Sequence, residues 1–139
     1  MTNPDDPGTA LASILARSES ADDGIRVAAV PELGHHIDQP MARARLQELM
    51  TRDKIVTVRV DAAEQLVRYG GEQGLLAVLT ELGRRHGDPD IDYTAYMLNE
   101  LEDFGAYPVL EKASSIDESQ LNPDARTGVE DLRHLMNRS

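Results

Sequence analysis

The sequence predicts an all-α protein, an α-α superhelix of about three to four stacked helix pairs. Three observations favour this fold class. Similar segments recur at intervals of 33 residues, each segment spaces its apolar residues as one face of a helix does, and aromatic residues make up only 4% of the chain. A core with few aromatic residues has to come from Leu, Val, Ile and Ala, which suits packing of helix on helix.

The repeat is visible as aligned segments with matching apolar positions. They begin at Ile25, Val58, Ile91 and Ala125, at spacings of 33, 33 and 34 residues. The same position is alanine in the first three segments: Ala29, Ala62 and Ala95. A second amphipathic stretch follows each of these three, at residues 40–50, 72–82 and 107–113. A helix pair with one apolar stripe per helix cannot bury that stripe alone, so neighbouring pairs have to stack.

These segments predict one helical repeat domain over residues 9–139, after a disordered tail of residues 1–8. The domain would consist of a capping helix at Thr9–Arg17, repeats near 25–57, 58–90 and 91–124, and a C-terminal capping helix at 125–137.

Short polar residues and glycines mark the expected ends of the helices. Asp22, Asp90 and Asp124 stand near helix starts, where a carboxylate accepts hydrogen bonds from free backbone N–H groups. Gly70-Gly71 and Gly105 are expected to stop helices in the left-handed conformation.

The chain resembles the HEAT-repeat family in two stretches, VRVDAAEQLVRYGGEQGLLAVLTEL from Val58 and DPDIDYTAYMLNELEDFGAYPVLEKA from Asp88. Both follow the family's order of an apolar start, an Ala-rich first helix, a Gly turn and a Leu-rich second helix. Pro31 resembles the proline that often kinks the first helix in this family. The resemblance covers roughly residues 22–136 and implies an α-solenoid. One departure is Asp92, which stands where aligned segments carry Arg: Arg26, Arg59 and Arg126.

Composition limits the classes of partner and compartment. The net charge of −11 argues against nucleic acid as a direct ligand, because binding its backbone needs clustered Lys and Arg. The chain has no cysteine, which excludes disulfides and thiolate sites. Its start has no signal-peptide pattern and no apolar stretch approaches the roughly 20 residues that span a bilayer, so we expect a cytoplasmic protein that does not bind membranes.

The segment HGDPDIDYTAYMLNELEDFG begins like a calcium-binding loop, with aspartates at alternate positions 88, 90 and 92. That loop needs Gly at its sixth position and Glu at its twelfth, where this sequence has Tyr93 and Asn99. We therefore interpret Asp88 and Asp90 as a turn and a helix cap, and expect no metal. His35 and His36 are adjacent and point about 100° apart on a helix, so they do not form a chelating pair.

Motifs that would indicate catalysis or a cofactor are missing. The serines near the N-terminus lack a nucleophile elbow, and Gly70-Gly71 is not followed by the Lys-Ser of a phosphate loop. HEAT-like repeats occur in phycobilin lyases and in some DNA glycosylases, but no residue here distinguishes a lyase and the negative charge conflicts with a glycosylase. We expect a non-enzyme without a cofactor; a HEAT-like lyase-type enzyme or chromophore-handling protein is the alternative.

Acidity is concentrated in one part of the chain. Residues 86–124 carry one basic and ten acidic residues, a net charge of −9, whereas residues 25–85 carry nine basic and eight acidic residues. The predicted binding residues lie in this segment: Asp88, Asp90, Asp92, Tyr93, Tyr96, Glu100, Glu102 and Asp103. The two tyrosines are either anchors for a partner or core residues that replace absent Phe, and the carboxylates either bind a partner or are simply solvated.

The sequence thus predicts a non-catalytic module for protein–protein interaction, whose partner is basic at the contact surface. An inhibitor or immunity-type protein that covers a basic nuclease is one concrete form, and an adaptor or assembly subunit is another.

Overall fold

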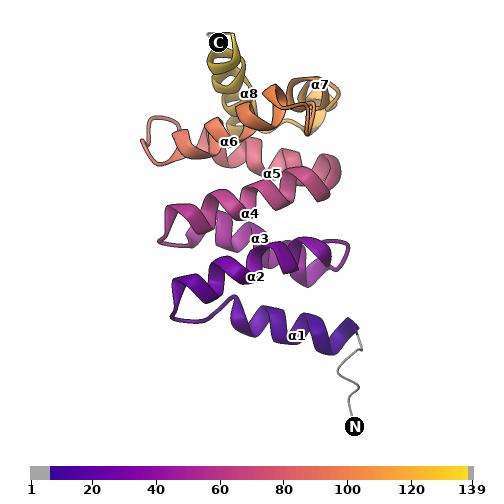
Figure 1. Cartoon of the computed structure of the whole chain (residues 1–139). Helices are drawn as coiled ribbons and strands as arrows, with labels where there is room; N and C mark the ends of the chain where they lie inside the picture. The colour runs from indigo at the N-terminus through magenta and orange to yellow at the C-terminus, as the bar shows by residue number, and fades with distance from the viewer. Residues whose placement is uncertain (1–6, 138–139) are drawn as a thin grey trace. The chain divides into compact units, whose positions relative to one another are not determined.

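The computed structural model describes residues 7–137, and every regular element in this range is helical, as the sequence predicts (Figure 1). The elements are, in chain order, α1 (Pro7–Arg17), α2 (Asp23–His35), α3 (Pro40–Arg52), α4 (Val56–Tyr69), α5 (Gly71–Arg84), α6 (Ile91–Asp103), α7 (Val109–Ser114), the 3-10 helix η1 (Glu118–Gln120) and α8 (Pro123–Met136). Contacts divide the chain into two compact units between Tyr69 and Gly70.

The helices lie where the repeat predicts them, with differences at the two ends. Of the predicted tail of residues 1–8, residues 1–6 lie outside the described range, and residues 7 and 8 belong to α1. The third pair is the least regular. Its second helix, α7, has only six residues, and η1 lies in the polar stretch between α7 and α8.

In the first unit, α2 and α4 pack side by side, α3 packs against both, and α1 packs against α2 and α3 (Figure 1). The repeated apolar positions form its core: Ala29, Leu33, Leu46, Val58, Ala62 and Leu66 have no exposed surface. Tyr69 does not belong to this core. It is the last residue of α4, and 52% of its surface is exposed.

A buried ion pair between Arg26 and Asp53 joins distant segments of the first unit. Nε and Nη2 of Arg26 donate to the two carboxylate oxygens of Asp53 at 2.9 and 3.2 Å, and Nη1 donates to the carbonyl of Ser20 at 3.0 Å. Asp53 also accepts from the backbone N–H of Ile55 at 2.9 Å. Burial alone would raise the pKa of Asp53, but the hydrogen bonds from Arg26 and Ile55 outweigh it, so the pKa is lowered.

The second unit is built on a close contact between α5 and α8. A Cβ atom added to Gly83 of α5 would lie 1.7 Å from the carbonyl oxygen of Asp124, and one added to Gly128 of α8 would lie 2.1 Å from that of Leu79. The two backbones therefore touch directly. α6 packs against α5, α7 and α8 around this contact.

This arrangement differs from the pattern of the first unit. There the first helices of neighbouring repeats, α2 and α4, pack together, whereas α8 packs chiefly against α5, which is a second helix. The two glycines account for the close approach of α8 to α5, because a side chain at either position would meet the backbone of the other helix.

The predicted helix ends are confirmed in part. Oδ1 of Asp22 accepts from the N–H groups of Gly24 and Ile25, and Gly71 and Gly105 have positive φ angles of 66° and 68°. Two predicted caps are wrong. Asn122, not Asp124, caps α8 by accepting from the N–H of Ala125.

The second wrong cap is Asp90, whose side chain makes no capping hydrogen bond at the start of α6. Its backbone is already helical, with φ −67° and ψ −26°, whereas a capping residue needs an extended backbone for its side chain to reach the free N–H groups.

We expect Asp53→Ala to lower the free energy of unfolding by roughly 3 kcal/mol, because it leaves a buried guanidinium without its carboxylate. The lowered pKa means that this contribution is present above pH about 4 and is lost as the pH falls through the folded-state pKa. Urea denaturation measures it. Asp38→Ala, at an exposed carboxylate of the same unit, is the control, and an equal loss in both variants would contradict the assignment.

We expect Gly83→Ala and Gly128→Ala each to destabilise the protein by about 1–3 kcal/mol, because the new methyl group has to push two helix backbones apart. Gly24→Ala is the control, since its Cβ would meet only the side-chain oxygen of Asp22, at 3.1 Å. Thermal unfolding with equal midpoints for all three variants would show that the α5–α8 contact is not tight.

Candidate functional site

The candidate site is the outward side of α6. Thr94, Met97, Leu98 and Leu101 are buried on the inner side of this helix. The residues on the opposite side are exposed, and we call them the α6 face: Asp92, Tyr93, Tyr96, Glu100 and Asp103. Their spacings of three and four residues place them on one side of the helix, over about 16 Å of its length.

The structure decides how the two tyrosines lie. Tyr93 is 58% and Tyr96 52% exposed, so neither replaces a missing Phe in the core. Surface tyrosines of this kind offer a large contact area with few rotatable bonds.

In the described part of the chain, three carboxylates of the α6 face lack the cation partners that some other carboxylates of the protein have. Among the described residues, no cation pairs with Asp92, Glu100 or Asp103, and α6 contains no Lys or Arg. Asp103 only accepts from Nδ2 of Asn99, at 3.4 Å. Elsewhere glutamates pair with arginines, as in Glu32 with Arg17, Glu48 with Arg45 and Glu64 with Arg68. The α6 face therefore has negative charge that the described part of the chain does not neutralise.

The other three predicted binding residues lie at the ends of helices instead. Asp88 accepts from the N–H of Asp90 at 2.9 Å and from Arg85 at 3.4 Å, which holds the turn before α6. Glu102 accepts from the N–H of Leu110 at 3.1 Å, at the start of α7. Asp90 is exposed at the N-terminal end of α6. The structure thus brings together five of the eight predicted residues.

Phe104 extends the exposed aromatic surface and is missing from the predicted site. It is 83% exposed, the most exposed large apolar residue described. It follows Glu100 by four residues, a spacing that could have placed it beside the α6 face, but it directly precedes Gly105, where the sequence predicts a turn that ends the helix. That turn exists: Gly105 donates to the carbonyl of Glu102, and Ala106 donates to that of Leu101.

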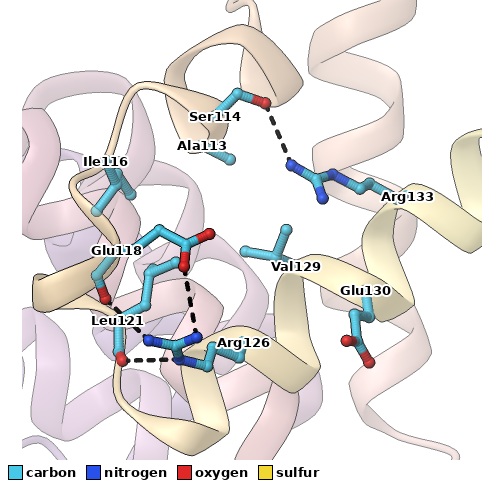
Figure 2. Close-up of a pocket in the computed structure, with 9 residues that line it drawn as sticks. All are labelled: Ala113, Ser114, Ile116, Glu118, Leu121, Arg126, Val129, Glu130 and Arg133. Atoms are coloured by element: carbon cyan, nitrogen blue, oxygen red, sulfur yellow. Dashed lines mark hydrogen bonds and ion pairs between the residues drawn. The ribbon is translucent and has the colours of Figure 1, made fainter.

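A cavity of about 190 Å³ lies between α7, η1 and α8, with the apolar side chains of Ala113, Ile116 and Val129 in its lining (Figure 2). Arg126 donates to the carbonyls of Leu121 and Glu118 at 3.2 and 3.1 Å, and thereby ties η1 to α8. Arg133 reaches Oγ of Ser114 at 3.4 Å from the other side. These polar contacts connect neighbouring segments and do not form a nucleophile with a base.

Two shallower hollows lie in the first unit. One, of about 410 Å³, is lined by Arg26, Asp53 and neighbouring residues, and the other, of about 500 Å³, lies between α1 and α2. His35 and His36 line the second hollow, at the end of α2. Among the described residues, no three side chains of the metal-binding types are grouped as a metal site would require.

One contact joins two residues that are distant in sequence and was not predicted. Nδ1 of His86, after α5, donates to Oδ2 of Asp131 on α8 at 2.7 Å. The two residues are 45 positions apart, so no local spacing reveals the pair. The hydrogen bond and the charge of Asp131 raise the pKa of His86.

No protein-family model, curated protein or solved structure matches the chain. Within residues 7–137, no helix has the length and apolar character that crossing a membrane requires.

We expect NMR titration to give His86 a pKa above the ordinary value near 6.5, and Asp131→Asn to lower it. Because the folded-state pKa is raised, the pair stabilises the protein fully below pH about 6.5, and this contribution is lost as the pH rises through the raised pKa. Glu130→Gln, one residue away on α8, is the control. A His86 pKa that responds equally to both variants would rule out a specific pair.

Proposed function

We propose that the protein is a non-catalytic, HEAT-like binding module that recognises a basic protein through the α6 face. One observation carries the proposal: half-exposed tyrosines share one side of a helix with carboxylates that have no cation partner among the described residues.

Both parts of this surface favour association. Tyr93 and Tyr96 supply apolar area that a partner can cover, and tyrosine is frequent among the residues that dominate binding energy. The carboxylates supply the matching charge. Because the helix contains no cation of its own, a basic partner gains attraction without first breaking an ion pair within α6.

The charge of the surrounding segment would also speed the encounter. Residues 86–124 have a net charge of −9 and surround the α6 face in sequence. A concentrated negative potential attracts a positive partner over a distance set by the ionic strength. Salt-dependent association is therefore part of the proposal.

An inhibitor or immunity-type protein, acting in the cytoplasm, is the form of this function that we favour. A small acidic protein can cover the basic surface with which a nuclease holds its substrate, and it needs no catalytic group to do so.

We expect the combined variant Asp92→Asn, Glu100→Gln, Asp103→Asn to slow association with the partner by about tenfold at low salt, and to weaken its salt dependence. Immobilised wild-type protein and variant are incubated with extract of the native host, and each retained protein is then purified for binding kinetics at two ionic strengths.

The matched control neutralises three exposed carboxylates elsewhere: Glu19→Gln, Asp38→Asn and Glu72→Gln. The proposal requires a retained protein that is basic, that is lost with the α6 variant and that persists with the control. If neutralising the α6 face leaves the set of retained proteins unchanged, another surface binds the partner and the proposal fails.

A further inference from the structure

We infer that the α6 face selects arginine over lysine side chains, with one guanidinium stacked on Tyr96 between Asp92 and Glu100. This inference rests on the proposed function and specifies the chemistry of the partner.

Tyr96 lies at the centre of the α6 face. Asp92 precedes it by four residues, Tyr93 precedes it by three, and Glu100 follows it by four. Helix neighbours at these spacings have Cβ atoms about 5–6 Å apart. A cation over the ring of Tyr96 would therefore have a carboxylate on each side and a second ring beside it.

The two basic side chains would use this arrangement differently. A guanidinium is planar, stacks on an aromatic ring and directs several N–H donors sideways in its plane, toward both carboxylates. An ammonium is a compact, strongly hydrated charge that can approach either a ring or a carboxylate. Because it is not planar, it cannot stack on the ring and donate to the carboxylates beside the ring at the same time.

The described part of the chain does not supply the guanidinium. Among the described residues, no arginine forms an ion pair with Asp92, Glu100 or Asp103, and arginines such as Arg17 and Arg68 pair with Glu32 and Glu64 instead. In residues 86–124 the one basic residue is Lys112, which lies on α7. We therefore assign the arginine that stacks on Tyr96 to the partner.

The length of the α6 face suggests how the arginines are spaced. Asp92, Tyr96 and Glu100 follow one another at steps of about 6 Å along the helix axis. In a partner helix with arginine at every fourth residue, the arginines follow one another at the same interval of about 6 Å. A helical peptide of this design can therefore align more than one guanidinium with the residues of the α6 face.

The probes are two fluorescein-labelled alanine–glutamine peptides, identical except that one has arginine and the other lysine at every fourth position. Fluorescence anisotropy measures their binding to the full-length protein. We expect the arginine peptide to bind roughly two- to fivefold more tightly, as a stacked cation at an exposed aromatic ring would give.

Three substitutions locate the preference. Tyr96→Phe keeps the ring and is expected to keep the preference, whereas Tyr96→Leu keeps apolar bulk and is expected to abolish it. Tyr69→Leu is the matched control, because Tyr69 has the same exposed fraction as Tyr96, 52%, but lies on α4 beside Arg68.

The outcomes separate this inference from the proposed function. Equal binding of both peptides, reduced by the combined neutral variant of the α6 face, overturns arginine selection and leaves a basic partner in place. An arginine preference that survives Tyr96→Leu also overturns it. If the combined variant changes the binding of neither peptide, both the inference and the proposed function fail.

Discussion

The direct contact of the α5 and α8 backbones is the constraint on which the second unit depends. Gly83 and Gly128 have no side-chain atoms, and this absence lets α8 lie directly on α5. α6 then packs against both helices with one side only. Its other side remains exposed, and this side carries the α6 face.

Different ion pairs fix the ends of helices in the two units. In the first unit Arg26 and Asp53 connect segments that are distant in sequence. In the second unit, the side chain of Glu81 is only 3% exposed and accepts hydrogen bonds from Arg84 and Arg85 at the end of α5. Arg85 also donates to the carboxylate of Asp88. A buried charge is tolerated only when oppositely charged partners lie close to it. The Arg26–Asp53 pair and the cluster around Glu81 therefore each favour the one arrangement of the chain that brings the partners together.

Local sequence predicted the helices because their apolar spacing and their glycine stops are local signals. It could not predict that α8 lies on α5, since the two glycines responsible belong to no repeated position, nor that His86 meets Asp131. At the candidate site, the spacing predicted that Tyr93 and Tyr96 lie on one helix, but it could not show whether their side chains are buried or exposed. Helix α6 also has apolar residues on its other side, including Met97 and Leu98. Only the packing shows which of the two sides faces the core.

The exposure of Phe104 has a practical consequence. The chain contains no tryptophan, so its intrinsic fluorescence comes from four tyrosines. A tryptophan at position 104 would be the single indole of the molecule, at the end of α6 and almost entirely in solvent. Its emission would respond when a partner covers this end of the helix. Among the described residues, the most exposed large apolar side chain thus offers an optical reporter for the surface beside it.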